Sequence, residues 1–174
     1  KHAFEAQEGL LEALHRVPVR AGDFVFVDGG VPHAIGGGCF MIELQEPSDL
    51  MVVAERETPS GRRIPDGKIF CGLDPEGMLD VYAYDGVDYD ELCRRYVRRG
   101  VGGRVVGPEL TDKFAMWILR GGDALSLRRD RGVAVVIAGA GELNGLSVRK
   151  GDRLVFADET RLELNADAEV VVCC

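Results

Sequence analysis

The sequence predicts a mainly β protein made of two small β-barrels, the first of them incomplete in this chain, with two short helices. Three observations lead to this fold class. Short apolar runs bounded by Gly, Asp or Asn fill the chain from Lys113 onward. A glycine-rich corner separates two apolar runs near the start of the chain. The pattern V-R-x-G-D occurs at 19–23 and again at 148–152, and each copy leads into an apolar run and an aspartate, Asp28 or Asp158. Repeated short strands with turn residues between them are typical of β-barrels.

The part of the chain before Lys113 is expected to contain both helices. Apolar residues at helical spacing from Phe4 to Leu14 predict a short amphipathic helix that ends near His15. A second helix is expected over 88–99, because acidic residues begin it and arginines end it, which suits the helix dipole. Strands are expected at 15–20, 24–28, 40–45 and 49–54. The prolines and glycines of 57–80 predict a long irregular crossing.

The part of the chain after residue 110 is expected to be entirely β. Its strands are predicted at 113–119, 124–128, 132–138, 146–149, 153–157, 161–164 and 169–174. The predicted organisation is therefore a C-terminal part of a first barrel with its leading helix (1–56), a crossing linker (57–110) and a second barrel (111–174). The glycine–histidine corner is absent from the second copy of the repeat.

Composition limits the classes of partner and location. The formal net charge of −8 argues against a nucleic-acid partner, because phosphate backbones bind clustered Lys and Arg. No run approaches the roughly 18 consecutive apolar residues of a membrane span, and no signal peptide is visible. The five cysteines form no C-x-x-C pair, which indicates reduced thiols and predicts a cytoplasmic protein.

His33 is the strongest candidate for a functional residue. It follows Pro32 at the corner between two apolar runs, where glycine permits positive φ and proline fixes the backbone before the imidazole. Two interpretations are open: a metal or active-site histidine, and a histidine hydrogen-bonded within its own turn. Glu43 and Gln45 alternate along the next expected strand and so share one face. That face is either the barrel interior or a solvent-facing edge.

These residues carry a resemblance to a known family. Residues 22–33 resemble the second motif of the cupin barrels, G(x)5PxG(x)2H, with Gly22, Gly30 and His33 at the expected spacings and Asp28 where the motif has proline. PHAIG and the ELQEPSD string that follows it resemble the cupin-type (type I) mannose-6-phosphate isomerases, especially their shorter bacterial relatives. The resemblance covers residues 1–60 and continues more weakly beyond. It implies two cupin-like (jelly-roll) barrels, of which the second is degenerate.

The resemblance also implies a site. It implies a divalent metal, usually zinc, in a barrel mouth where an aldose phosphate and its ketose isomer interconvert. Of the family's metal ligands only one matches this chain, at His33, and the others are expected upstream of Lys1. Glu43 is then a candidate acid/base and Gln45 a substrate contact. A basic cluster beside the motif is expected either to meet the sugar phosphate or to be a solvated loop: Arg62, Arg63 and Lys68.

One departure from the family bears on catalysis. At the position of the arginine that is thought to assist proton transfer, this chain has Val53, and Arg56 lies three residues on, on the opposite face of a strand. Either a bulge reorients Arg56, which is then a catalytic candidate, or the protein has altered chemistry. The resemblance implies a metal-dependent sugar-phosphate isomerase. The alternative is a non-catalytic sugar-phosphate-binding or regulatory two-barrel protein that has lost the catalytic arginine.

The first barrel has too few strands to close, which would leave unpaired sheet edges. An upstream segment, or a second copy of the chain in a homo-oligomer, is expected to cover them.

Overall fold

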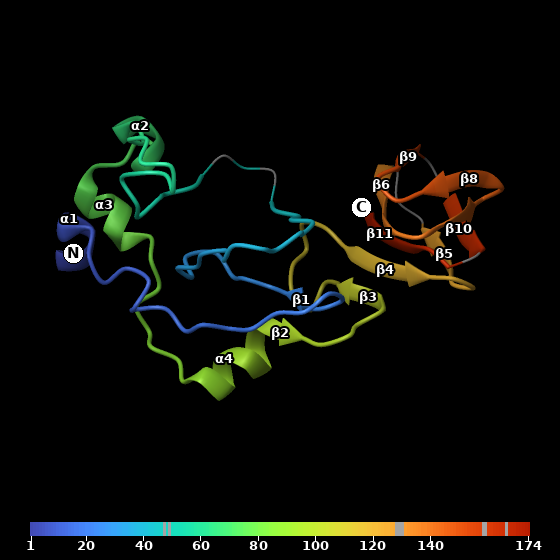
Figure 1. Cartoon of the computed structure of the whole chain (residues 1–174), viewed down its shortest axis with the longest axis horizontal. Coiled ribbons are helices and arrows are strands. Elements are labelled where there is room, and N and C mark those ends of the chain that lie inside the picture. Colours follow the sequence, from blue (N-terminus) through green and yellow to red (C-terminus); the bar gives the residue numbers. More distant parts are fainter. Residues whose placement is uncertain (47, 49, 128–130, 158–159, 166) are drawn as a thin grey trace. The chain divides into compact units, whose positions relative to one another are not determined.

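The computed structural model of the protein describes residues 1–46, 48, 50–127, 131–157, 160–165 and 167–174. Asp49 of the ELQEPSD string, Asp158 of the second repeat and the last residue of the strand predicted at 124–128 lie outside these ranges. The described chain is mainly β with few helices, and it divides into two compact units (Figure 1). The first unit comprises Lys1–Arg20 and Val25–Val97, and the second comprises Ala21–Phe24 and Arg98–Cys174. Within the described ranges, no helix is long and apolar enough to span a bilayer.

The first unit contains more helices than the sequence predicted. Its described residues form α1 (His2–Ala6), α2 (Asp66–Ile69), α3 (Pro75–Asp80) and α4 (Tyr89–Tyr96). Two of them, α2 and α3, interrupt the segment that was expected to be irregular. Asp74 caps α3, because its carboxylate accepts a 2.7 Å hydrogen bond from the Gly77 N–H and Pro75 occupies the first turn.

One of the two predicted helices is confirmed and the other is much shorter than predicted. The helix predicted over 88–99 is confirmed as α4, where the Asp88 carboxylate accepts from the N–H groups of Asp90 and Glu91 at 3.0 Å each. It ends early because Val97 is extended and enters strand β2 (Val97–Arg98). The prediction of a helix up to His15 was wrong, since α1 ends at Ala6 and Gln7 adopts a left-handed conformation with φ 55°.

The strands predicted in the first half are mostly wrong. Only the strand expected at 24–28 has a counterpart, β1 (Phe24–Val25), which pairs with β2 as a two-stranded sheet. The described residues of 15–20, 40–45 and 49–54 form no strand. A strand forms only where a neighbouring strand supplies hydrogen bonds. The apolar side chains expected inside a barrel are instead exposed to solvent, with Phe40 79% and Leu50 85% exposed.

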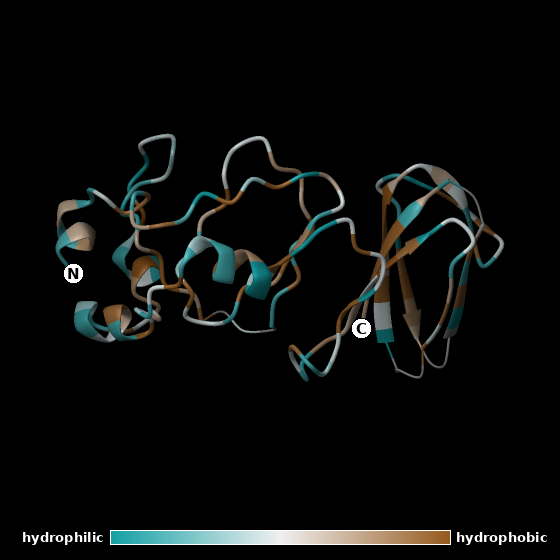
Figure 2. Ribbon diagram, turned by 90° about the horizontal axis from the view of Figure 1, so that it is seen from below, coloured by the Kyte–Doolittle hydropathy of each residue, from teal (hydrophilic) through white to brown (hydrophobic). Residues whose placement is uncertain are grey.

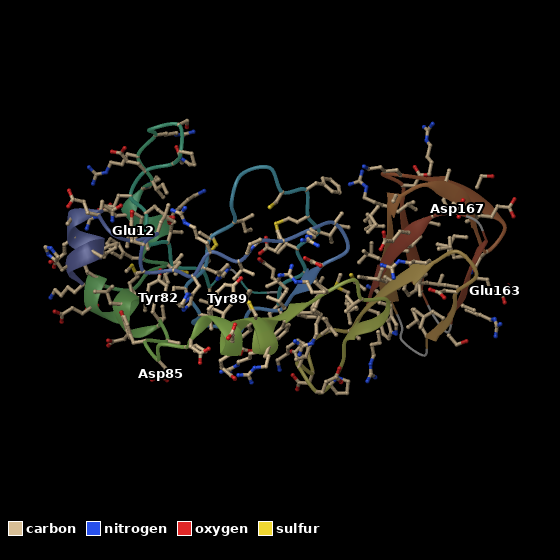
Figure 3. The ribbon with its side chains drawn as sticks, turned by 60° about the horizontal axis from the view of Figure 1, so that its bottom comes forward. Glu12, Tyr82, Asp85, Tyr89, Glu163 and Asp167 are labelled. Carbon is tan, nitrogen blue, oxygen red and sulfur yellow. The ribbon has the colours of Figure 1, made fainter. Side chains whose placement is uncertain are left out.

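A small apolar cluster holds the helices of the first unit. Phe4, Ile69 and Met78 are its buried members, and half-buried side chains such as Tyr82 pack against them (Figure 3). Gln7 ties α1 to the chain at 54–56, because its amide donates to the Ala54 carbonyl at 3.0 Å and accepts from the Arg56 N–H at 2.7 Å.

The second unit is built of two antiparallel sheets, and it confirms the predicted all-β region. The four-stranded sheet has the order β5-β10-β7-β8 and the five-stranded sheet has the order β3-β4-β11-β6-β9. The strands are β3 (Gly103–Val106), β4 (Met116–Arg120), β5 (Ala124–Leu127), β6 (Arg131–Ala138), β7 (Ala140–Leu143), β8 (Leu146–Arg149), β9 (Arg153–Ala157), β10 (Thr160–Asn165) and β11 (Glu169–Cys173). The sheets are separate among the described residues, so the closed barrel that the sequence predicted is not observed.

The core of the second unit lies between these strands. Alternate residues of β6 are buried, and the central strand β11 carries the buried run Val170, Val171 and Val172. Figure 2 shows the corresponding hydrophobic colouring along the strands of this unit. Leu164 of β10 is also buried in this core. The short apolar runs of the sequence thus indicated these two strands correctly, and the structure decided which of their faces is buried.

Two strands of the second unit were missed by the sequence analysis. One is β3, in the segment assigned to a linker, and the other is β7, which lies between the strands predicted at 132–138 and 146–149. β7 and β8 form a hairpin around Asn144 and Gly145, with φ values of 52° and 75°. Asn-Gly is the strongest short hairpin signal, so β7 was detectable from the sequence.

The V-R-x-G-D repeat has a structural counterpart. In the second copy, the turn between β8 and β9 is closed by the Asp152 carboxylate, which accepts from the Arg149 N–H at 2.9 Å, and Gly151 has φ 96°. In the first copy, Gly22 has φ 88° in the turn before β1. Each copy therefore forms a turn that enters a strand, and glycine is required because φ is positive.

Candidate functional site

The corner that carries His33 is a tight turn held by the backbone. The Val31 N–H donates to the Asp28 carbonyl at 3.2 Å, and Gly30 has φ 80°. The Gly30 carbonyl accepts from the Ala83 N–H at 2.8 Å, and a Cβ added at Gly30 would lie 2.8 Å from the Val81 carbonyl oxygen. Glycine is thus required at position 30 for both its conformation and its close contact with the chain after α3.

The imidazole of His33 has one ring nitrogen in a hydrogen bond, and no contact of the other is found among the described residues. His33 is exposed, and its Nδ1 lies 2.8 Å from the Val31 carbonyl oxygen. Because a carbonyl only accepts, Nδ1 is the donor in this contact. Metal-binding histidines commonly have this arrangement, with the second nitrogen donating to a backbone carbonyl. The same bond is also what a histidine with a purely local role would make.

The other residues of the E-x-Q string are not brought to His33. Glu43 and Gln45 are exposed in a segment without strand pairing. Among the described residues, no hydrogen bond or ion pair joins either of them to His33. The shared face predicted from strand alternation therefore has no counterpart, because the strand itself is absent.

Arg56 is engaged in packing. Its guanidinium lies over the Phe4 ring at 4.8 Å from the centroid, and its buried Nε has no hydrogen-bond partner among the described residues. Val53, at the position of the family's arginine, is half-buried and its N–H donates to the Ile69 carbonyl at 3.1 Å. Both residues thus belong to the surroundings of the α1–α2–α3 cluster.

The basic cluster forms an exposed loop before and within α2. Arg63 lies 3.6 Å from Asp66, and the Arg62 N–H donates to the Thr58 hydroxyl at 3.1 Å. Lys68 is exposed in the last turn of α2. The three cations are accessible to an anion, and the ion pair of Arg63 is a weak surface pair.

The described residues do not by themselves form a metal site. They contain no group of three or more His, Cys, Asp or Glu side chains placed to hold a metal ion. Zinc takes about four ligands, and the donor set found here is one imidazole. The chain alone therefore does not fit the metal that the resemblance implies.

Sequence reasoning missed a group of residues next to the His33 corner. The Asp28 carboxylate accepts a 3.0 Å hydrogen bond from Arg95 Nη2, and the Arg95 guanidinium lies 5.1 Å from the centroid of the Tyr96 ring. Tyr96 is buried. The sequence analysis assigned the arginines of α4 only to the end of the helix. Asp28, which stands where the cupin motif has proline, was a signal that this position could pair with an arginine.

Comparison with known proteins gives one similarity in sequence. No protein-family model matches the chain. The chain is 26% identical over 166 residues to the mannose-6-phosphate isomerase of Streptococcus mutans, an alignment that covers 91% of this chain and 50% of that protein. The chain thus spans about half the length of the curated relative that it matches.

Similar solved structures include two that are described as cupins. The similar structures also include a bacterial pirin from Escherichia coli in complex with nickel(II), with TM-score 0.35, 20% identity, and 44% of this chain and 41% of that chain covered. An RmlC-like cupin protein from Desulfovibrio desulfuricans has TM-score 0.32, 20% identity and coverages of 42% and 78%. The cupin domain of a transcriptional regulator from Enterobacter cloacae has TM-score 0.31, 17% identity and coverages of 42% and 90%.

Proposed function

We propose that the protein carrying this chain is a metal-dependent isomerase of the cupin type that interconverts an aldose phosphate and a ketose phosphate, as in the conversion of mannose 6-phosphate to fructose 6-phosphate. The observation that carries the proposal is the sequence similarity to a mannose-6-phosphate isomerase, which extends along 91% of the chain. The five free cysteines support a reducing, cytoplasmic location.

In this proposal each site residue has a role suited to its chemistry. His33 offers Nε2 as one ligand of a divalent metal, with zinc as the usual ion, and the remaining ligands come from outside this chain. The isomerisation moves a proton between C1 and C2, and Glu43 supplies a carboxylate able to accept and return it. Gln45 contacts a substrate hydroxyl, and Arg56 is kept as a second catalytic candidate. The sugar phosphate meets three exposed cations: Arg62, Arg63 and Lys68.

The test is an isomerase assay of the intact protein with added zinc, manganese or nickel. His33→Ala should lose bound metal and activity, whereas His2→Ala, which alters an exposed histidine of α1, should leave both unchanged. Elemental analysis of the same samples reports metal content independently of turnover. An intact protein that shows no aldose–ketose exchange with any of the three metals would refute the assignment.

A second candidate function is favoured by Val53 and Arg56. Valine cannot donate a hydrogen bond from its side chain, and the Arg56 guanidinium packs on the Phe4 ring. These observations favour a non-catalytic sugar-phosphate-binding or regulatory protein. Calorimetric titration discriminates the two, because a binder gives heat with mannose 6-phosphate and no product, and Arg62→Ala should weaken that binding.

We also propose that the exposed apolar residues between 25 and 51 are covered by strands from an upstream segment or from a second copy of the chain. Phe40 and Leu50 are the most exposed of them. Apolar surface of this kind favours association or aggregation. A well-behaved monomer of the 174-residue chain in size-exclusion chromatography would count against this proposal.

A further inference from the structure

We propose that residues 41–45 of one copy of the chain add a strand to the β9 edge of a second copy, and that two copies exchange this contact in a homodimer. The inference goes beyond the proposed isomerase activity. It rests on the proposal that the exposed apolar residues between 25 and 51 are covered, and it names the surface of a second copy that covers part of them.

The first observation is that β9 is an open sheet edge. It ends the five-stranded sheet, and its strand partner among the described residues is β6 alone. Val155, at the centre of β9, is 80% exposed. Edge strands are usually protected by a charge, a proline or a bulge, yet β9 pairs with β6 without a bulge and its one charged residue, Arg153, stands at its start. An edge of this kind is a template for another strand.

The second observation is a small apolar cavity beside this edge. Leu154 and Phe156 of β9 are half-buried and line a cavity of about 120 Å³ together with Leu162 of β10. A strand added to β9 would place alternate side chains on the face of Leu154 and Phe156, where they would cover this cavity. The edge thus provides the two features that recognise an added strand, which are a backbone ladder and a pocket for alternate side chains.

The third observation is that segment 41–45 has the pattern of a strand and belongs to no strand among the described residues. Its exposure alternates, since Ile42 and Leu44 are half-buried while Glu43 and Gln45 are exposed and Met41 is 48% exposed. Alternation of this kind suits pairing with a sheet edge, because only a neighbouring strand supplies the missing hydrogen bonds.

Charge decides the register of the pairing. Glu43 and Arg153 form no ion pair with any described residue of their own chain. An antiparallel register that places them opposite each other also matches apolar residues, whereas a slip of one residue would turn Glu43 toward the cavity. The pairs in this register are Glu43 with Arg153, Ile42 with Leu154 and Met41 with Val155. The dimer and a substrate therefore compete for the Glu43 carboxylate.

The test is sedimentation velocity of the full chain without metal or substrate over a range of protein concentrations. We expect a reversible dimer with a Kd in the micromolar range, as is typical of small interfaces. Val155→Lys places a charge in the middle of the edge and should raise the Kd at least about tenfold. Ser126→Lys is the matched control, because it adds the same charge at an exposed position of β5, an edge strand of the other sheet.

A charge exchange tests the register. Glu43→Lys and Arg153→Glu should each raise the Kd about three- to tenfold, and the double variant should restore most of the loss. Both side chains are exposed, so the variants should stay folded, which circular dichroism checks.

Two results would overturn the inference. One is a monomer at all concentrations. The other is a dimer that neither Val155→Lys nor the single charge variants weaken, which would leave a second copy as the cover through another surface. Because the readout needs no turnover, a failed isomerase assay would refute the proposed function and leave this result standing.

Discussion

Leu164→Ala tests whether the second unit is stabilised by the core between its two sheets. Leu164 is 1% exposed and belongs to the cluster formed by the buried residues of this unit. Its backbone is also engaged, because its carbonyl accepts from the Gly122 N–H at 2.9 Å and its N–H donates to the Asp123 carbonyl at 3.0 Å. The position cannot readily move to fill a cavity, so the full cost of the lost side chain should be observed.

The magnitude follows from the burial. Each buried carbon contributes about 0.8 kcal/mol, so the side-chain carbons lost on mutation to alanine amount to about 2.4 kcal/mol. The remaining cavity raises the expected loss in the free energy of unfolding to about 3–4 kcal/mol. Leu146→Ala is the matched control, because Leu146 is 59% exposed and its truncation should cost about 1 kcal/mol or less.

Urea unfolding followed by tryptophan fluorescence measures this difference. Trp117 is the single tryptophan of the chain, and it lies in β4 and packs against the same core. Its signal therefore reports on the second unit. Equal losses in Leu164→Ala and Leu146→Ala would refute the assignment of the core.

Three further predictions concern other parts of the chain. Burial raises the pKa of the Cys173 thiol to about 11. Alkylation of Cys173 at pH 8, followed by mass spectrometry, should therefore be about 100-fold slower than alkylation of the exposed Cys39. Equal rates would contradict the buried position of Cys173. Gly139→Ala should prevent the second unit from folding, because the added methyl would overlap a backbone carbonyl, and circular dichroism measures the loss of strand signal. In the control Gly145→Ala the methyl enters open space, so only the strain of a positive φ is expected. Asp88→Ala removes the cap of α4 and should lower the helix's protection from hydrogen exchange by about 1 kcal/mol, with no change expected outside the first unit.

The sequence predicted the second unit well because its information is local. The apolar runs of β6 and β11 mark strands that find partners within the same segment of chain. The start of α4 was equally readable, since Asp88 caps the residues that directly follow it. Even the missed hairpin had a local signal in Asn144-Gly145.

The first unit was predicted less well because an apolar pattern is not sufficient to form a strand. Residues 40–45 have the composition of a strand, yet a strand forms only where another strand supplies hydrogen bonds. Phe40 shows the consequence, since it is exposed although its type favours burial. The short helices α2 and α3 depend on packing around Met78, which no short window of sequence indicates.

The sequence by itself indicated the His33 corner, because Gly30, Pro32 and His33 lie within four consecutive residues and the turn there is local. The tertiary structure decided which contacts support that corner and which predicted residues stay away from it. Asp28 meets Arg95, 67 positions along the chain, and Arg56 turns to Phe4. Contacts between distant segments depend on the packing of the whole unit, and spacing within a motif carries no information about them.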